Sequence, residues 1–171
     1  MPDRLFPIHQ FGDPVLRRKA RRISTRRIRS SDLQRLTRGM FLALRKARGV
    51  GLAAPQVGYP SSIVVVNIGP GRTPYHGVFF NLVIVARSKS KVVSWEGCLS
   101  LPAVRGKVRR SNYIRVRYQD ESGVKREERF SGYLALVLQH EVDHLNGILY
   151  VDRMRDLRSL MSAEEYRTRI S

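Results

Sequence analysis

The stretch QHEVDHLNG, residues 139–147, contains the pattern H-E-x-x-H. Positions i and i+4 of a helix lie on one face, so His140 and His144 can offer ring nitrogens to one metal ion. Glu141 then lies beside the metal, where it can exchange protons with a bound water molecule. Two ordinary histidines on a core helix are the alternative interpretation. The pattern predicts a metal site carried by a helix.

The local sequence supports a helix around this pattern. Ser131 is a candidate N-cap, residues 133–138 contain no helix breaker, and Gly147 suits the position after a helix end. One face is apolar, with Leu134, Leu138, Val142 and Leu145. The histidine side is also apolar, with Tyr133, Leu136 and Val137. Because a helix that is apolar nearly all round is buried, we expect this helix in the core.

Two histidines do not complete a catalytic metal site, which needs three protein ligands and one open position. Gly147 also fits a longer pattern with a third histidine, but the last position of that pattern is Tyr150. The remaining histidines are His9 and His76, and the only cysteine is Cys98. Cys98 lies far upstream, so only the fold could bring it to the helix. The residues alone leave the third ligand open.

The composition limits the classes of protein to consider. With 171 residues, 42% of them hydrophobic, the chain is long enough for one domain, residues 1–171, with its own core. A single cysteine excludes an intramolecular disulfide and fits a reducing compartment, so we expect a cytoplasmic protein. No window has the apolar length of a membrane span, and residues 1–9 lack a signal-peptide core.

The formal net charge is +18, with basic residues concentrated in residues 17–48 and 105–129. Such a charge favours a polyanionic neighbour, either nucleic acid or an acidic membrane surface. A solvated basic surface without a partner is the alternative, and charge alone does not decide between the two.

A second stretch, GVGLAAPQVG at residues 49–58, is dense in Gly, Ala and Pro. Such density indicates a backbone that passes close to another group. Gln56 within it offers an amide donor that could bond a substrate oxygen. A plain loop between a helix and a strand is the alternative interpretation.

The rest of the chain carries helix and strand signals. Asp32 is expected to cap a helix that ends at Gly49 and whose apolar positions are Leu33, Leu36, Met40, Leu44 and Ala47. Buried strands are predicted at 62–68 and 78–85 around a loop at 69–74, with further strands at 91–95, 114–118 and 124–130. Arg115 and Arg117 should form a basic outer face on the fourth of these strands. A short strand at 148–151 and a short helix at 157–166 follow. The expected fold is α+β, with antiparallel or mixed sheets around one buried metal-binding helix.

Three stretches in this order resemble the signature motifs of peptide deformylases: GVGLAAPQ (49–56), EGCLS (96–100) and QHEVDHLNG (139–147). The segment GDPVLR (12–17) is also similar to the N-terminal segment of that family. The resemblance extends over roughly residues 8–152, and three motifs in order make a chance match a poor explanation.

The resemblance implies an enzyme that removes the N-formyl group from the N-terminal methionine of nascent polypeptides. It implies that Cys98 joins His140 and His144 in binding Fe²⁺, or Zn²⁺, Ni²⁺ or Co²⁺ in its place. Glu141 would carry protons, and the Gln56 amide with the Leu99 N–H would stabilise the oxyanion. The residues expected to contact the substrate are Val50, Gly51, Gly97 and Arg105, with Tyr133, Leu136 and Val137 beside an apolar methionine pocket.

Two features depart from the family pattern. Leu82 follows Asn81 where the family usually has proline, and the tail after Met154 is shorter than in relatives with a long C-terminal helix.

The expected partners are a formyl-methionyl nascent peptide and, through the basic face, the ribosome surface. The protein is expected to be a monomer that does not enter the membrane.

Two other functions remain as alternatives. A zinc peptidase would use Glu164 or Glu165 as the third ligand. A basic nucleic-acid-binding protein with a structural metal would show salt-dependent binding and no hydrolysis.

Overall fold

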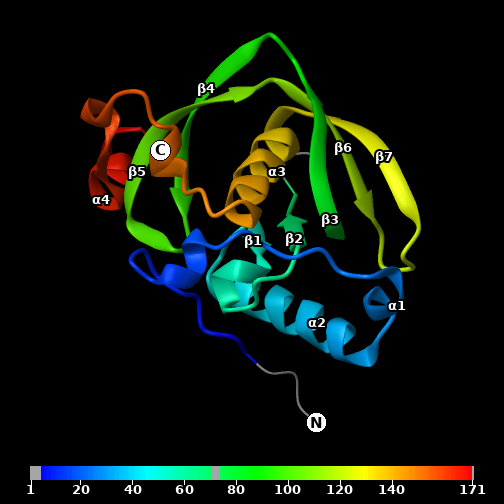
Figure 1. The fold of residues 1–171 in the computed structure, drawn as a ribbon. Helices are drawn as coiled ribbons and strands as arrows, with labels where there is room; N and C mark the ends of the chain where they lie inside the picture. Colours follow the sequence, from blue (N-terminus) through cyan, green and yellow to red (C-terminus); the bar gives the residue numbers. More distant parts are fainter. Residues whose placement is uncertain (1–4, 71–73, 171) are drawn as a thin grey trace.

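The histidine-bearing helix, α3 (Gly132–Leu145), lies between two antiparallel sheets in the computed structural model, which describes residues 5–70 and 74–170 (Figure 1). One sheet contains, in spatial order, β1 (Gly51–Ala53), β2 (Ile63–Ile68), β3 (Tyr75–Arg87), β6 (Tyr113–Gln119) and β7 (Lys125–Ser131). The other contains β4 (Lys91–Cys98), β5 (Leu101–Ser111) and β8 (Met161–Ser162). Helix α3 contacts strands of both sheets, so the expected α+β class with a central helix is confirmed.

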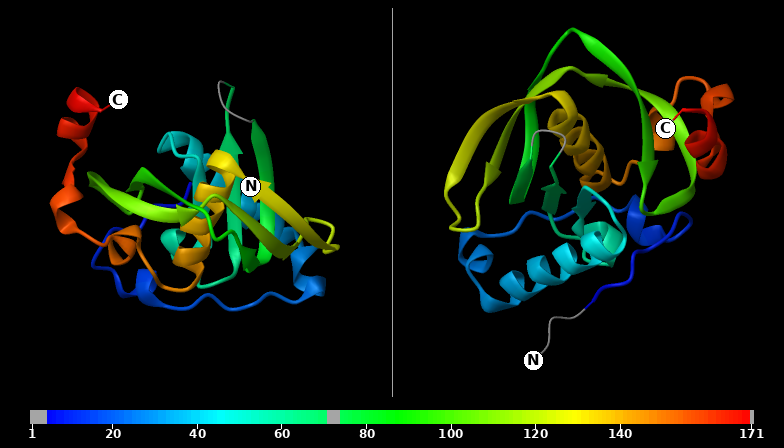
Figure 2. Two further views of the ribbon diagram at one scale, coloured as in Figure 1. Left: turned by 90° about the horizontal axis from the view of Figure 1, so that it is seen from above. Right: turned by 180° about the vertical axis from the view of Figure 1, so that it is seen from behind.

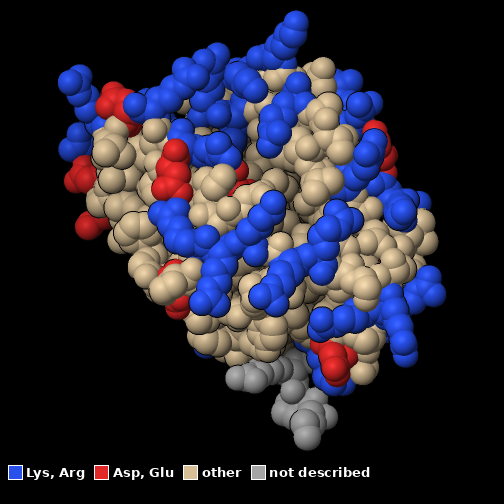
Figure 3. Space-filling view, in the orientation of Figure 1, with Lys and Arg blue, Asp and Glu red and all other residues tan. Residues whose placement is uncertain are grey.

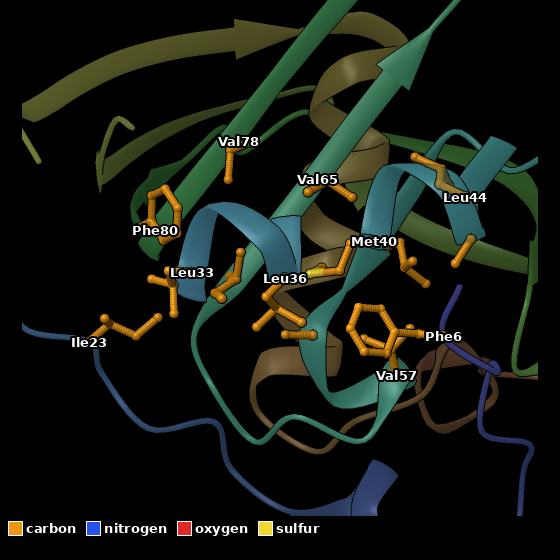
Figure 4. Close-up of a cluster of buried hydrophobic side chains, with 14 of the residues drawn as sticks. Phe6, Ile23, Leu33, Leu36, Met40, Leu44, Val57, Val65, Val78 and Phe80 are labelled. Atoms are coloured by element: carbon orange, nitrogen blue, oxygen red, sulfur yellow. The ribbon is translucent and has the colours of Figure 1, made fainter. Parts of the chain in front are cut away.

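Helix α2 (Ser31–Lys46) covers the face of the five-stranded sheet opposite α3 (Figure 2). Strand β2 is buried on both faces because a helix covers each face of the sheet. Side chains alternate along a strand, so Val65 packs with α2, whereas Val64 packs with α3. Figure 4 shows the α2 side of this core, formed by Leu33, Leu36, Met40 and Leu44 against Val65, Val78 and Phe80. The described residues include no helix with the length and apolarity needed to cross a membrane.

The predicted start of α2 is wrong by two residues. Ser30 is the N-cap, and its hydroxyl accepts a hydrogen bond from the Leu33 N–H at 3.4 Å. Asp32 lies in the first turn, where its negative charge suits the positive end of the helix dipole. A short helix, α1 (Thr25–Ile28), precedes α2 and was not predicted.

The stretch at residues 49–58 is not a plain loop. Residues 51–53 form strand β1, which is fully buried and pairs with β2, and a 3-10 turn, Ala54–Val57, follows directly. Gly58 follows with φ of 84°, a conformation that favours glycine.

The strands predicted before α3 are present, but the C-terminal predictions are partly wrong. Residues 148–151 do not form a strand, because the Asp152 carboxylate accepts from the Leu149 N–H and closes a 3-10 turn, Tyr150–Arg153. The predicted helix at 157–166 is divided into a 3-10 turn at Leu157–Ser159, strand β8 and helix α4 (Ala163–Arg169). Strand β5 was not predicted. The predicted loop at 69–74 includes residues 71–73, which lie outside the described residues.

Helix α3 begins and ends where its sequence indicates. Ser131 occupies the N-cap position, although its side chain makes no capping hydrogen bond, and Gly147 follows the helix with φ of 72°. A side chain at Gly147 would collide with the Arg17 carbonyl oxygen, so the N-terminal segment crosses directly against this turn.

Asn81 ties the N-terminal segment to the five-stranded sheet. Its carbonyl accepts from the Ile23 N–H at 2.8 Å, and its amide donates to the Ile23 carbonyl and to the Gln119 side chain. Asn81 is buried and adopts φ of 56°, beside an irregularity in the pairing of β3 with β6. Leu82, which stands at the usual proline position, is buried in the core packed on α3. The local turn is therefore a bulge within β3.

We expect Asn81→Ala to lower the free energy of unfolding by roughly 2–4 kcal/mol. The change leaves buried polar partners of Asn81 without a hydrogen bond, and it places alanine in a left-handed backbone conformation that alanine adopts poorly. Asn81→Gly keeps the backbone conformation and should lose only the hydrogen-bond part. Urea unfolding measures both variants. Asn67→Ala, which removes a more exposed contact with His76, is the matched control. An Asn81→Ala loss no larger than that of the control would refute the role of this residue.

Candidate active site

Three metal-binding side chains converge where the end of β4 meets α3. The Cys98 sulfur lies 3.2 Å from His144 Nε2, which lies 3.2 Å from His140 Nε2. The three donor atoms all lie within 4.8 Å of one another. A thiolate and two imidazoles form a donor set suited to a divalent transition metal, so the residues fit such an ion.

The other residues considered as a third ligand lie elsewhere. His9 pairs with Asp13, and His76 contacts Asn67. Glu164 and Glu165 are exposed on α4, where Glu165 pairs with Arg169. The third ligand that the zinc-peptidase alternative requires is therefore not at the site.

A buried ion-pair network supports the histidines. Arg110 of β5 donates two hydrogen bonds to Glu96, at 2.7 and 2.9 Å, and a third to Asp143 of α3. The other side of Asp143 accepts from Arg153. Glu96 also accepts from His140 Nδ1 at 2.8 Å, which leaves His140 Nε2 free to face the other donors.

The network sets the protonation of its members. Burial alone would raise the pKa of Glu96, but the hydrogen bonds from Arg110 and His140 lower it to about 2. Burial alone would lower the pKa of His140, but its contacts with Cys98 and Glu96 raise it well above the usual value. Burial and the neighbouring charges of His140 and Arg110 lower the pKa of His144.

Sequence reasoning missed this network. Glu96 and Asp143 lie inside the second and third motifs, so their positions were visible as candidates. Arg110 is one of many basic residues in a basic stretch, so the sequence does not distinguish it from surface arginines. The pairing of β5 with β4 places it in the interior, where its side chain is only 6% exposed.

Glu141 is buried, and its Oε2 atom has no hydrogen-bond partner among the described residues. Burial raises its pKa to about 7. Gly51 of β1 lies so close that a Cβ there would come within 2.5 Å of the Glu141 carboxylate. A carboxylate of this kind is suited to accept a proton and release it again near neutral pH.

Gln56 is held with its amide hydrogens toward Cys98. Its carbonyl accepts from the Ala53 N–H at 2.9 Å, which fixes the orientation of the amide. The amide nitrogen lies 3.2 Å from the Ser100 hydroxyl and 3.6 Å from the Cys98 sulfur. Leu99 follows Cys98 directly, and its side chain packs against the α2 core.

A cleft of about 620 Å³ lies over these groups, between β1, β4 and α3. Gln56, Cys98, Leu99, His140 and Glu141 line it. All residues that the resemblance assigns to the substrate also line it, namely Val50, Gly51, Gly97, Arg105, Tyr133, Leu136 and Val137. His144 lies behind His140 and is not part of the cleft wall. The cleft also includes Arg48, Ser94, Trp95 and Tyr166, which sequence reasoning did not single out.

Comparisons with known proteins agree with this geometry. Residues 5–159 match the sequence profile of the family described as Polypeptide deformylase. A peptide deformylase of Leptospira biflexa is 42% identical over 158 residues, which cover 88% of each chain. Peptide deformylase 2 of a Nostoc strain is 36% identical over 97% of this chain and 95% of its own.

Solved structures show the same fold. The class I type b peptide deformylase of Acinetobacter baumannii bound to Met-Ala-Ser has a TM-score of 0.85 and 33% identity, over 90% of this chain and 100% of its own. Peptide deformylase from Thermotoga maritima has a TM-score of 0.81 and 38% identity, over 90% and 99%. The family profile matches most of the chain, and the relatives share its sequence and its fold, so this chain belongs to the polypeptide deformylase family.

Proposed function

We propose that Cys98, His140 and His144 hold the catalytic divalent ion of a hydrolase that removes the N-formyl group from N-terminal methionine. The reaction converts a formyl-methionyl peptide and water to formate and a methionyl peptide. The observation that carries the proposal is the convergence of three metal donors beside a buried carboxylate oxygen without a partner.

Fe²⁺ is the metal that we propose for the cell, with Zn²⁺, Ni²⁺ or Co²⁺ as substitutes. One thiolate and two imidazoles suit each of these ions and leave a coordination position open. A bound ion supplies Lewis acidity toward a water molecule and the formyl carbonyl. Glu96 holds His140 in one orientation through its Nδ1 atom.

Residues that line the cleft carry out the proton transfers and stabilise the negative charge. Glu141 takes a proton from the attacking water and returns it to the leaving amine nitrogen. The Gln56 amide and the Leu99 N–H donate to the oxygen that becomes negative as the carbonyl carbon turns tetrahedral. The fixed amide of Gln56 supports this role, since its carbonyl is already bonded to Ala53.

Two open strand edges offer places for an extended peptide. Among the described residues, β1 and β4 each end their sheet, and both line the cleft. We propose that the peptide backbone pairs with these edges at Val50, Gly51 and Gly97, as peptides add to exposed edges elsewhere. Arg105, whose side chain lies over Gly97, borders the same path.

The methionine side chain enters the apolar part of the cleft beside α3. Tyr133, Leu136 and Val137 lie there on the turns before His140. The Met-Ala-Ser peptide bound by the Acinetobacter protein supports a formyl-methionyl peptide as the substrate of this chain. A zinc peptidase would cleave unformylated peptides equally well, so comparing formylated with unformylated Met-Ala-Ser separates the two functions.

We further propose that residues 1–171 form one catalytic domain, a monomer that acts in the cytoplasm where nascent chains emerge. Helix α3 contacts strands of both sheets, which supports a single folded unit. The basic surface would bring the protein to ribosomal RNA. Figure 3 shows a face where Lys and Arg side chains outnumber Asp and Glu, and residues 17–29 run across this face.

The basic residues of the protein are not equally available to a polyanion. Arg115 and Arg117 both pair with Glu127 on the neighbouring strand, so the basic outer face predicted for β6 is partly neutralised. The segment at residues 17–29 instead exposes Arg18, Lys19, Arg21, Arg22, Arg26 and Arg27. This segment is therefore the better candidate for an RNA contact.

Cys98→Ser should lose most of the bound metal, because a hydroxyl is a far poorer ligand than a thiolate for these ions. Elemental analysis of anaerobically purified protein measures the metal, and formate release measures the activity. His76→Ala, which removes a histidine outside the cluster, should keep both. Full metal content with unchanged activity in Cys98→Ser would remove Cys98 from the site.

Glu141→Gln should retain the metal and lose turnover by roughly 10²- to 10⁴-fold, as expected when a general base is removed. The measurement is kcat on a formyl-methionyl peptide together with metal content. Glu164→Gln, an exposed glutamate on α4, is the control. Loss of the metal together with the activity would make Glu141 a ligand and contradict the proposed role.

Association with ribosomes should weaken steeply as salt rises. Dissolved ions screen the attraction between basic side chains and RNA phosphates, and the screening length falls to about 8 Å near physiological ionic strength. Co-sedimentation across a salt series measures it. The test variant changes Arg18, Lys19, Arg22 and Arg26 to Gln. The control variant makes the same charge change elsewhere, at Arg87, Lys89, Arg155 and Arg158. Equal binding by both variants would leave this segment without a specific role.

A further inference from the structure

The two proposed oxyanion donors lie on separate elements of the chain. Gln56 belongs to the 3-10 turn Ala54–Val57, whereas Leu99 lies in the tight turn between β4 and β5. The Gln56 amide donates to the Ser100 hydroxyl of that second turn at 3.2 Å. Donors stabilise a developing negative charge best when their positions are fixed before the reaction. A constant separation of the two turns is therefore a requirement of the proposed mechanism.

An N-terminal segment outside the three motifs hydrogen-bonds to both turns. The His9 N–H donates to the Gln56 carbonyl at 2.8 Å. Two residues later, the Phe11 N–H donates to the Ser100 carbonyl, also at 2.8 Å. Residues 9–11 therefore bridge the turn that carries the Gln56 amide and the turn that carries the Leu99 N–H.

The Gln10 side chain acts on the Leu99 end of this bridge. Its amide donates to the Leu99 carbonyl at 3.2 Å and to the Ile8 carbonyl of its own segment at 3.0 Å. The Leu99 side chain is held from another direction, since a Cβ at Gly49 would come within 2.7 Å of it. Contacts on both its side chain and its carbonyl restrict rotation of the Leu99 backbone, which fixes the direction of its N–H.

The bridging segment is itself held by contacts at its two ends. His9 Nδ1 lies 2.6 Å from the Asp13 carboxylate. The His9 ring also packs against Gly58, where a Cβ would come within 2.8 Å of Nε2. Asp13 caps the 3-10 turn Pro14–Arg17 through its side chain. These contacts keep the segment in one place, so it can hold the two turns at a fixed separation.

We propose that residues 9–11 form a brace between the two oxyanion donors, and that Gln10 is a positioning residue that acts through Leu99. The inference rests on the proposed deformylase function. Residues 8–13 are not among the described residues that line the cleft, so Gln10 reaches the reaction only through other residues. Loss of its amide should therefore slow the chemical step and leave substrate binding unchanged.

The main test replaces the Gln10 amide with a side chain of similar length that cannot donate. In the cobalt-loaded full-length chain, Gln10→Met should lower kcat on formyl-Met-Ala-Ser amide by roughly three- to thirtyfold with KM unchanged, a smaller loss than removal of an oxyanion donor causes. Gln10→Lys restores a donor at this position and should recover most of the loss. Gln34→Met, at an exposed position on α2, is the matched control and should behave like the native chain.

A second measurement does not depend on activity. Amide hydrogen exchange in fragments that cover residues 97–101 should become roughly two- to tenfold faster in Gln10→Met, while exchange in α3 stays unchanged. The unfolding temperature and the cobalt content should match those of the native chain, because Gln10 is exposed. Gln34→Met should leave exchange unchanged in both regions.

The outcomes separate the brace from the proposed function. An unchanged kcat in Gln10→Met overturns the brace and leaves the deformylase function intact. A raised KM, a loss of cobalt or faster exchange throughout the chain also overturns it, because each indicates a role in substrate binding or in general stability. A loss of kcat that Gln10→Lys does not restore excludes the hydrogen bond as its cause. Failure of the native chain to release formate contradicts the proposed function itself, whatever the exchange shows.

Discussion

The fork of Arg110 between Glu96 and Asp143 is the interaction on which the site depends. It joins β4, β5 and α3 through side chains that are 6–9% exposed. Removing one partner from such a buried pair leaves an uncompensated charge, which destabilises a protein far more than loss of a surface pair. The same fork fixes Glu96, and Glu96 orients His140. The stability of the interior and the orientation of a proposed ligand therefore rest on the same guanidinium.

Two glutamates of the cleft show how burial acts differently on like groups. Glu96 is paired with a guanidinium and an imidazole, which lower its pKa to about 2 and keep it charged. Glu141 lacks a cation bonded to it, so burial raises its pKa to about 7. One carboxylate is thus a fixed charge that holds structure, whereas the other can gain and lose a proton.

Much of this architecture was accessible from the sequence, and the failures have physical causes. The histidine helix has a serine at its N-cap position, an unbroken apolar run and a glycine just after its end, so its local sequence signals all indicate the same helix. Residues 148–151 look like a strand, but Asp152 bonds the backbone and turns the chain. Cys98 and Arg110 reach α3 only through the pairing of β4 and β5, which local periodicity does not reveal. The family resemblance supplied the cysteine. Nothing in the sequence singled out Tyr166, because its place in the cleft follows from how β8 docks.

The separation of the metal donors along the chain has a consequence for biosynthesis. Cys98 and His144 are 46 residues apart, and they meet only after β4 and α3 have docked. A growing chain therefore cannot present the complete donor set until His144 has left the ribosome. The complete set of donors is therefore a product of tertiary structure, so binding of a metal by all three side chains is coupled to the docking of β4 and α3.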